Sequence, residues 1–201
     1  MIRVFLAEDQ MMIRSALVSL IGLEDDLEVV GEAGDGHQAV TLVAALRPDV
    51  ALLDIDMPGL DGLSACAKIV ETVPGCHCLI LTAMNKPGLL QRALRAKARG
   101  YIVKHAPAAE LFDAIRAVAA GQRVVDTSLA VAALAEEEIA ITDRELEVVR
   151  MIAEGSSARD IARRLHLTEG TVRNYTSNVM AKCGARNRVE LVRIADDRGW
   201  V

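Results

Sequence analysis

Five polar residues follow or end short apolar runs of the sequence, and together they have the chemistry of phosphoryl transfer. They are three carboxylates, a hydroxyl and an ammonium: Glu8, Asp9, Asp54, Thr82 and Lys104. Clustered carboxylates raise one another's pKa values unless a cation neutralises them. Mg²⁺ is the expected cation, because it prefers oxygen ligands and bridges to phosphoryl groups. Asp54 is then the expected nucleophile, forming an acyl phosphate that Lys104 and Thr82 bind.

The apolar runs and the segments between them predict how these residues are positioned. Strands are predicted at residues 4–7, 28–33, 50–53, 78–81 and 101–103, and helices near residues 10–23, 36–46, 61–71, 87–98 and 108–120. Such alternation forms right-handed βαβ units with a parallel sheet covered on both faces. Sites in open parallel sheets form at the carboxyl ends of the strands. The five polar residues are therefore expected to meet at one edge of the sheet.

These residues, together with the MPGLDG stretch after Asp54, resemble the receiver domain of bacterial response regulators over residues 2–120. The resemblance implies that Asp54 is the phosphoacceptor. It implies Mg²⁺ ligands at the side chains of Asp9 and Asp54, at the main-chain carbonyl of Asp56 and, through water, at Glu8. It also implies a switch pair, Thr82 and Tyr101. The implied fold is α/β, a doubly wound, CheY-like five-stranded parallel sheet in the order 2-1-3-4-5.

One position departs from the receiver pattern. The family often has glycine where this chain has Lys97. If the fourth helix ends there in a left-handed conformation, a side chain at that position costs about 1 kcal/mol. We therefore expect this helix to end differently.

The last 61 residues have the signals of four helices. Thr142 and Glu145 form a capping-box pattern, and Gly155 ends the first predicted helix. Two further helices, joined by a tight turn before Thr168, match a helix-turn-helix, and a fourth is predicted from about residue 187 to 198. Residues 156–188 hold seven basic and two acidic residues, a net charge of +5 that suits phosphate contacts. A four-helix bundle with a solvated basic face is the alternative.

Residues 141–198 resemble the LuxR/NarL-type DNA-binding domain, through the stretches ITDRELEV and GTVRN. The resemblance implies an all-α, four-helix domain whose third helix enters the major groove. It implies that base edges are contacted by Arg173, Asn174 and Ser177. It implies that phosphates are approached by Arg164, Thr171 and Lys182.

The net charge of −5 is the sum of oppositely charged parts of the chain. Residues 1–124 carry −3, residues 125–140 carry −4 and residues 141–201 carry +2. The middle segment has four acidic residues, Asp126, Glu136, Glu137 and Glu138, and reads as a linker with one short helix capped by Ser128. The acidic total therefore does not exclude nucleic acid as a partner.

Composition excludes several other classes of protein. Of the 201 residues, 52% are hydrophobic and 25% are charged, so whole-chain disorder is not expected. Four cysteines are too few for a disulfide scaffold. Cys76 and Cys78 lack zinc-ligand spacing and are expected in a buried strand. No apolar run reaches about 18 residues, so no membrane span is expected. The acidic residue Glu8 interrupts the N-terminal apolar run, so no signal peptide is expected either. A cytoplasmic location is therefore expected.

Together the two halves resemble a NarL/FixJ-family response regulator, with a receiver at residues 1–122, a linker at 123–140 and a DNA-binding domain at 141–201. The resemblance implies a transcription factor whose Asp54 is phosphorylated by a sensor histidine kinase with Mg²⁺. Phosphorylation would drive homodimerisation and binding to promoter DNA and RNA polymerase, with no membrane partner. The stretches AEDQ, GTVRNY and RGW resemble the DesR-type subfamily, whose kinases respond to membrane lipid fluidity, which predicts control of a lipid desaturase.

Two alternatives remain open from the sequence. The chain could be a DNA-binding factor that acts without phosphorylation, with a constitutively dimeric receiver. It could also be a phosphatase of the haloacid-dehalogenase type, since Asp54-Ile55-Asp56 fits a D-x-D motif. The helix-turn-helix and the lack of a cap region argue against an enzyme. The only expected catalysis is uptake and slow loss of the chain's own phosphoryl group.

Overall fold

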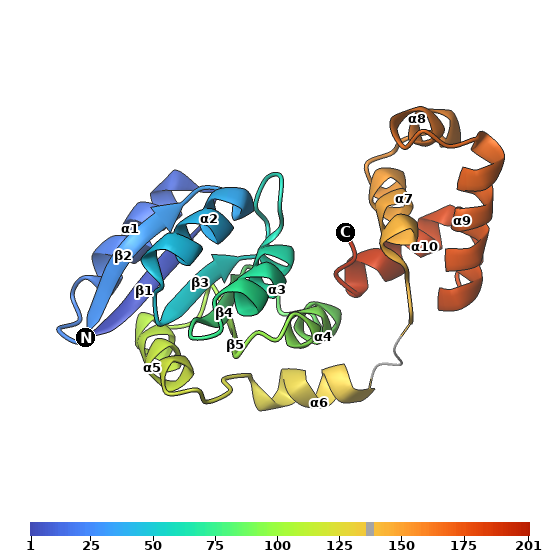
Figure 1. The fold of residues 1–201 in the computed structure, drawn as a ribbon. Helices are drawn as coiled ribbons and strands as arrows, with labels where there is room; N and C mark the ends of the chain where they lie inside the picture. The colour runs from blue at the N-terminus through green and yellow to red at the C-terminus, as the bar shows by residue number, and fades with distance from the viewer. Residues whose placement is uncertain (136–138) are drawn as a thin grey trace. The chain divides into compact units, whose positions relative to one another are not determined.

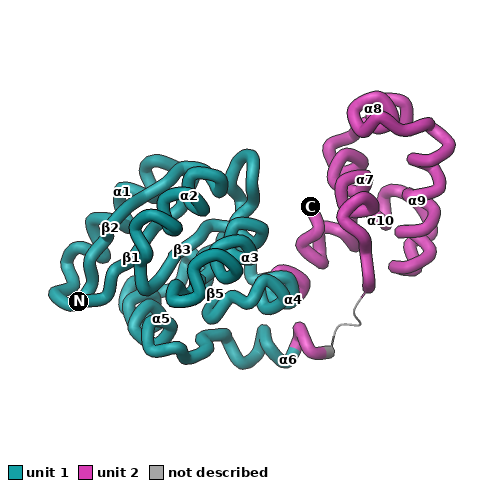
Figure 2. The backbone as a smooth tube through the Cα atoms, viewed as in Figure 1, with its two compact units in different colours: residues 1–85, 90–131 teal, residues 86–89, 132–201 magenta. Residues whose placement is uncertain are grey.

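The computed structural model describes residues 1–135 and 139–201 (Figure 1). The described chain divides into two compact units, residues 1–85 with 90–131 and residues 86–89 with 132–201 (Figure 2). Three of the predicted acidic linker residues, Glu136, Glu137 and Glu138, lie outside the described residues. Within the described ranges, no helix combines the length and the apolar character that crossing a membrane requires.

Strands and helices alternate along residues 2–119. In chain order they are β1 (Ile2–Ala7), α1 (Met11–Ile21), β2 (Leu27–Ala33), α2 (Gly36–Leu46), β3 (Val50–Asp54), α3 (Gly62–Thr72), β4 (His77–Thr82), α4 (Pro87–Arg95), β5 (Gly100–Val103) and α5 (Ala108–Ala119). The strands form one parallel sheet in the order β2-β1-β3-β4-β5, which confirms the predicted fold. Each predicted strand and helix is present, with ends displaced by a few residues at most.

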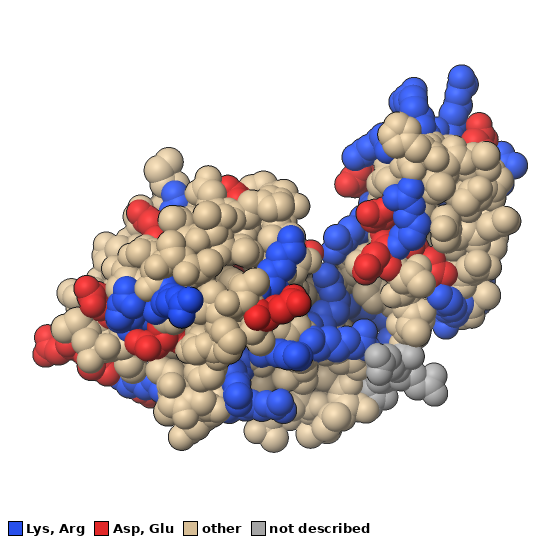
Figure 3. Space-filling model, viewed as in Figure 1, with Lys and Arg blue, Asp and Glu red and all other residues tan. Residues whose placement is uncertain are grey.

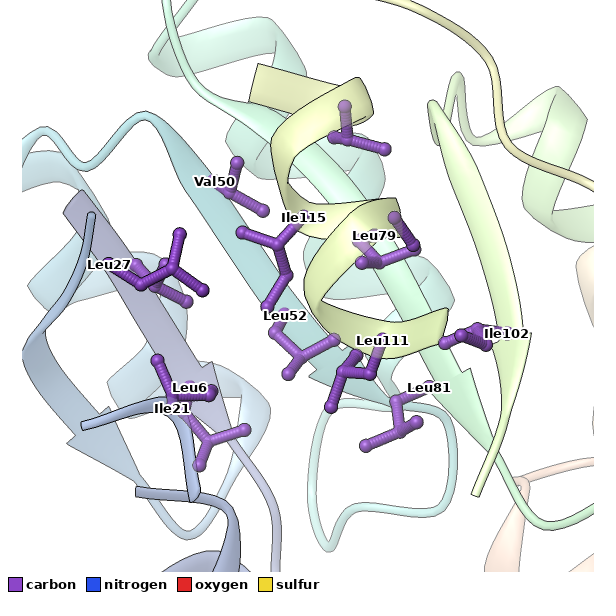
Figure 4. Packing of buried hydrophobic residues seen from close by; sticks show 13 residues of the cluster. Leu6, Ile21, Leu27, Val50, Leu52, Leu79, Leu81, Ile102, Leu111 and Ile115 are labelled. Atoms are coloured by element: carbon purple, nitrogen blue, oxygen red, sulfur yellow. The ribbon is translucent and has the colours of Figure 1, made fainter. Parts of the chain in front are cut away.

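The sheet is buried on both faces, as its nearly continuous apolar strands require. On one face, Leu111 and Ile115 of α5 pack over Leu52 and Leu79 of the central strands (Figure 4). Helices α2 and α3 pack against each other and against β1, β2, β3 and β4. Because side chains fill both faces, the strand ends are where buried polar groups can gather. Cys76 and Cys78 are both free and buried. Cys78 lies in β4 as predicted, whereas Cys76 is the residue directly before this strand.

Helix α4 ends at Arg95, three residues earlier than the sequence predicted. Lys97 follows it with φ 62°, in the left-handed region. The Lys97 and Ala98 N–H groups donate to the carbonyls of Leu94 and Ala93, which is the usual hydrogen bonding of such a helix end. The expectation that this helix ends differently was therefore wrong, because Lys97 adopts the left-handed conformation of a glycine ending and carries the strain that glycine avoids.

The segment after α5 runs along the free edge of β5. Val124 N–H donates to Arg99 O, and Tyr101 N–H donates to Val124 O, both at 2.9 Å. Helix α6 (Thr127–Ala135) follows. The prediction that Ser128 caps this helix was wrong, because the Asp126 carboxylate accepts hydrogen bonds from Leu129 N–H and from the Ser128 hydroxyl. Asp126 is one residue before the helix, where a capping side chain reaches the free N–H groups.

The second unit contains the four predicted helices. They are α7 (Asp143–Ala153), α8 (Ala158–Arg164), α9 (Glu169–Cys183) and α10 (Arg188–Asp197). Thr142 and Glu145 form the predicted capping box. Ser157, Thr168 and Asn187 cap the other three helices through their side chains. Residues from all four helices share one core, which includes Val149, Ile161, Val179 and Leu191.

Candidate functional site

Three carboxylates meet at the carboxyl edge of the sheet. Glu8 and Asp9 follow β1, and Asp54 ends β3. One carboxylate oxygen of each lies within 4.8 Å of those of the other two. Glu8 and Asp54 are buried, Asp9 is exposed, and Asp54 Oδ2 accepts no hydrogen bond from any described residue. A buried oxygen without a donor, beside two further carboxylates, fits a hard cation such as Mg²⁺.

Lys104 supplies the positive charge of this cluster. Its Nζ lies 2.7 Å from Glu8 Oε2 and 3.0 Å from Asp54 Oδ1. Burial and the charge of Glu8 raise the pKa of Asp54 to about 6, although the Lys104 ammonium acts in the opposite direction. Burial disfavours the charged form of Lys104, but hydrogen bonds to Glu8 and Asp54 outweigh it and raise the Lys104 pKa. One ammonium thus leaves the carboxylates short of positive charge, which a divalent cation could supply.

The hydroxyl groups of Thr82 and Tyr101 meet at a third residue, Met84. Met84 N–H donates to Thr82 Oγ1 at 3.1 Å, and the Tyr101 hydroxyl donates to Met84 O at 2.7 Å. Thr82 and Tyr101 are both buried. Sequence reasoning paired these two residues, but it had no signal for the peptide that connects them. Because Tyr101 N–H also donates to Val124 O, one residue of β5 contacts both the β4–α4 loop and the segment that follows α5.

The loop after Asp54 packs so closely that only glycine fits at position 62. A Cβ added at Gly62 would lie 1.8 Å from the main-chain oxygen of Asp54. The neighbouring Asp61 side chain accepts from Ser64 N–H and so begins α3. Asp56, whose carbonyl is a predicted metal ligand, lies exposed in this loop. The MPGLDG stretch therefore fixes the main chain beside Asp54.

Arg14 is a part of the site that the sequence did not reveal. Its Nη1 donates to the main-chain oxygen of Glu8 at 2.6 Å, and its Nε lies 3.3 Å from Glu32. Arg14 therefore ties α1 to the loop that carries two of the carboxylates. A single arginine on an amphipathic helix usually indicates a solvated residue, so the sequence carried no signal for this role.

The exposed face of α9 carries the predicted base-reading residues. Arg173, Asn174 and Ser177 are exposed, whereas Val172 and Val179 point into the core. Of the predicted phosphate contacts, Arg164 is exposed at the end of α8, and Thr171 lies partly exposed in the first turn of α9. Lys and Arg side chains gather around α8 on the face in Figure 3. Lys182, in the last turn of α9, forms an ion pair with Glu145.

Both halves of the chain match known families. Residues 4–116 match the response regulator receiver domain, and residues 140–195 match the luxR family of bacterial regulatory proteins. The chain belongs to the NarL/FixJ-type response regulators. It is a two-component transcription factor with a receiver domain and a helix-turn-helix DNA-binding domain. Regulators of this family partner with sensor kinases and bind promoter DNA.

This response regulator aligns with several known proteins over all or nearly all of its length. It is 43% identical to the transcriptional regulatory protein DesR of Bacillus subtilis (strain 168), covering 100% of this chain and 99% of DesR. It is 36% identical to the DNA-binding transcriptional activator DevR/DosR of Mycobacterium tuberculosis (strain ATCC 25618 / H37Rv), covering 98% and 95%. It is 32% identical to ChrA, a response regulator of a heme-sensing two-component system whose crystal structure is known. That structural match has a TM-score of 0.58 and covers 100% of this chain and 98% of ChrA. The alignments with these three proteins thus span both family matches of this chain, and the names of DesR and DevR/DosR are those of transcriptional regulators.

Proposed function

We propose that a sensor histidine kinase phosphorylates this response regulator on Asp54 in a Mg²⁺-dependent reaction, and that phosphorylation promotes dimerisation and promoter binding. The observation that carries the proposal is the buried Asp54 carboxylate, whose Oδ2 accepts no hydrogen bond from the part of the chain that the structure describes and whose Oδ1 lies 3.0 Å from the Lys104 ammonium. The proposed domains are a receiver at residues 1–122, a linker at 123–140 and a DNA-binding domain at 141–201. A regulator of chromosomal promoters would act in the cytoplasm.

The proposed chemistry assigns a separate role to each side chain at the edge of the sheet. Glu8, Asp9, Asp54 and the Asp56 carbonyl would hold Mg²⁺, which when bound neutralises charge and orients phosphoryl oxygens. An Asp54 oxygen attacks the phosphorus of a phosphohistidine, and the bond from phosphorus to the histidine nitrogen breaks. Lys104 stabilises the charge of the transferred group. Slow attack of water on the acyl phosphate would reverse the modification.

The proposed switch uses the hydrogen bonds around Met84. A phosphoryl group adds a charge near −2 and acceptor oxygens. The Thr82 hydroxyl and the Lys104 ammonium can bind these oxygens, and a shift of Thr82 changes the position of Met84, to which Tyr101 is bonded. Moving a two-state equilibrium from 1:99 to 99:1 requires about 5.5 kcal/mol of differential stabilisation. New charge-assisted bonds of the phosphoryl group are a physical source for a large part of it.

For the DNA-binding domain, we propose that α9 is the recognition helix. Arg173, Asn174 and Ser177 would contact base edges, because they form its exposed face. Arg164 and Thr171 would contact phosphates. Two such helices in a dimer would reach half-sites about 34 Å apart. RNA polymerase is the further partner that activation at a promoter would require.

The proposed target is the promoter of a membrane-lipid desaturase gene. The support is the likeness of the AEDQ, GTVRNY and RGW stretches to DesR-type regulators, together with the 43% identity to DesR. Footprinting of genomic fragments with and without acetyl phosphate tests this target directly. Protection of a desaturase promoter is expected, and protection of unrelated promoters alone would contradict the target but leave the general function intact.

The phosphorylation step is tested by uptake of labelled phosphate from acetyl phosphate. Uptake is expected to require Mg²⁺, to be lost in Asp54→Asn and to persist in Asp25→Asn, which changes an exposed carboxylate of the α1–β2 loop. DNA affinity is expected to rise with uptake. An Asp54→Asn protein that binds DNA with an unchanged response to acetyl phosphate would instead support a factor that acts without phosphorylation.

A further inference from the structure

Lys182 is held by a carboxylate of its own domain. Its Nζ lies 2.8 Å from Oε1 and 2.6 Å from Oε2 of Glu145, a residue 37 positions earlier in the chain. Lys182 lies in the last turn of α9, and Glu145 lies in the first turn of α7. The ion pair therefore joins the C-terminal end of the proposed recognition helix to the start of another helix.

Further contacts hold the Glu145 side chain in this position. Its side chain is 6% exposed, and its Oε2 accepts hydrogen bonds from the main chain and the hydroxyl of Thr142, both at 2.9 Å. The same carboxylate thus completes the capping box that begins α7. Burial of Glu145 tends to raise its pKa, but the bonds from Lys182 and Thr142 outweigh burial and lower it. A buried carboxylate of this kind is costly to leave without its cation.

The other basic residues of the proposed DNA face are held differently. Arg173 pairs with Glu169, and Arg164 pairs with Glu154, and in both pairs each side chain is at least 45% exposed. DNA can displace such exposed partners at little cost, because solvent screens them and takes the released carboxylate. If DNA displaced Glu145 from Lys182, a buried carboxylate would lose its cation. The exposed pairs therefore leave Arg173 and Arg164 available to DNA, whereas the buried pair indicates a different role for Lys182.

We propose that Lys182 is a positioning residue for DNA recognition, which acts by fixing α9 to α7 through Glu145 and does not neutralise a DNA phosphate. This inference rests on the proposed role of α9 as recognition helix. Fixing the end of α9 sets the orientation of Arg173, Asn174 and Ser177 relative to the rest of the domain. A change at Lys182 should therefore affect specific binding more than non-specific binding.

The test compares Lys182→Met, Glu145→Gln and the double variant in the full-length chain, with Arg164→Met as control. DNA affinity is measured over a series of salt concentrations, well below each Tm, for a genomic fragment protected in footprinting and for a random duplex of equal length. Thermal unfolding is recorded for each protein. Gln at position 145 retains a capping-box side chain, so the double variant removes the buried charge without removing the cap.

The expected result is that Lys182→Met lowers Tm and weakens binding to the specific fragment by about tenfold, with little effect on the random duplex. The slope of log affinity against log salt stays at the wild-type value. The double variant recovers Tm and specific affinity to near those of Glu145→Gln, because no buried charge is left unpaired. In Arg164→Met, loss of one phosphate contact makes this negative slope shallower by about 0.9.

Three results would overturn the inference. A slope that becomes shallower by about 0.9 in Lys182→Met, with no recovery in the double variant, would make Lys182 a phosphate contact. A lowered Tm with an unchanged ratio of specific to random affinity would make its role one of stability alone. Wild-type protein that binds neither duplex would contradict the proposed function as well, and this failure is seen before any variant is compared.

Discussion

The Tyr101 hydroxyl donates a 2.7 Å hydrogen bond to the main-chain carbonyl of Met84. The N–H of the same Met84 donates to Thr82 Oγ1, at the end of β4. On the other side, Tyr101 N–H donates to Val124 O in the segment that follows α5. A continuous series of hydrogen bonds therefore runs from the edge of the acidic cluster to the segment that precedes α6.

Replacing Tyr101 by phenylalanine is expected to weaken the response of DNA binding to phosphorylation. A net hydrogen bond contributes about 0.5–1.5 kcal/mol, so its loss changes the switch equilibrium by up to about tenfold. The measurement is the ratio of DNA affinities with and without acetyl phosphate, alongside phosphate uptake. Tyr175→Phe, at the other tyrosine of the chain, is the control. A wild-type ratio in Tyr101→Phe would show that the hydroxyl has no part in the switch.

Replacing Asp54 by asparagine is expected to stabilise the Mg²⁺-free protein at neutral pH. The pKa of Asp54 is about 6 in the folded chain against an ordinary value of 3.8, so folding disfavours its charged form. The resulting destabilisation is absent below about pH 4, grows as the pH rises to 6 and is constant above it. At 1.36 kcal/mol per pKa unit it amounts to about 3 kcal/mol.

Urea unfolding of wild type and Asp54→Asn between pH 4 and pH 8 measures this difference. Saturating Mg²⁺ should reduce it, because a cation bound to the folded wild type stabilises it by mass action. The exposed Asp25→Asn serves as control and should show little change. Equal stability of wild type and Asp54→Asn at every pH would mean that the charge of Asp54 in the carboxylate cluster does not destabilise the folded protein.

Replacing Lys97 by glycine is expected to increase the free energy of unfolding by about 1 kcal/mol. Lys97 has φ 62°, a conformation that is unfavourable for residues with a Cβ and open to glycine. The change in the urea midpoint measures the gain. Lys97→Ala separates backbone strain from loss of the lysine side chain, and it should give no comparable gain. If alanine and glycine stabilise equally, strain is not the cause.

Replacing Gly62 by alanine is expected to destabilise the receiver by about 2 kcal/mol or more and to reduce phosphate uptake. The new Cβ would lie 1.8 Å from the Asp54 carbonyl oxygen, so the main chain beside the phosphoacceptor must move. Unfolding and uptake are measured on the same protein. Gly75→Ala is the matched control, because a Cβ there meets no atom within 4 Å. Normal uptake in a stable Gly62→Ala protein would contradict the argument.

The sequence by itself determined the order of the helices and strands and which residues form the acidic cluster. The alternation of apolar runs with amphipathic segments predicts parallel strands, whose carboxyl ends must share one edge, so Asp54 and Lys104 had to lie near each other. Capping signals are equally local, and Thr142 with Glu145 was recognisable as a box because its partners are three residues apart. The error at Ser128 was local too, since Asp126 competes for the same free N–H groups.

Only the tertiary structure decided which side chains pair over long distances. The ammonium of Lys182 contacts Glu145, although the resemblance to LuxR/NarL-type domains implied a DNA phosphate for it. Arg14 reaches the Glu8 carbonyl, and Met84 connects Thr82 with Tyr101. Periodicity and capping reflect interactions within a few residues. Partners far apart in the chain depend on how helices and strands pack, and a single sequence carries little record of that packing.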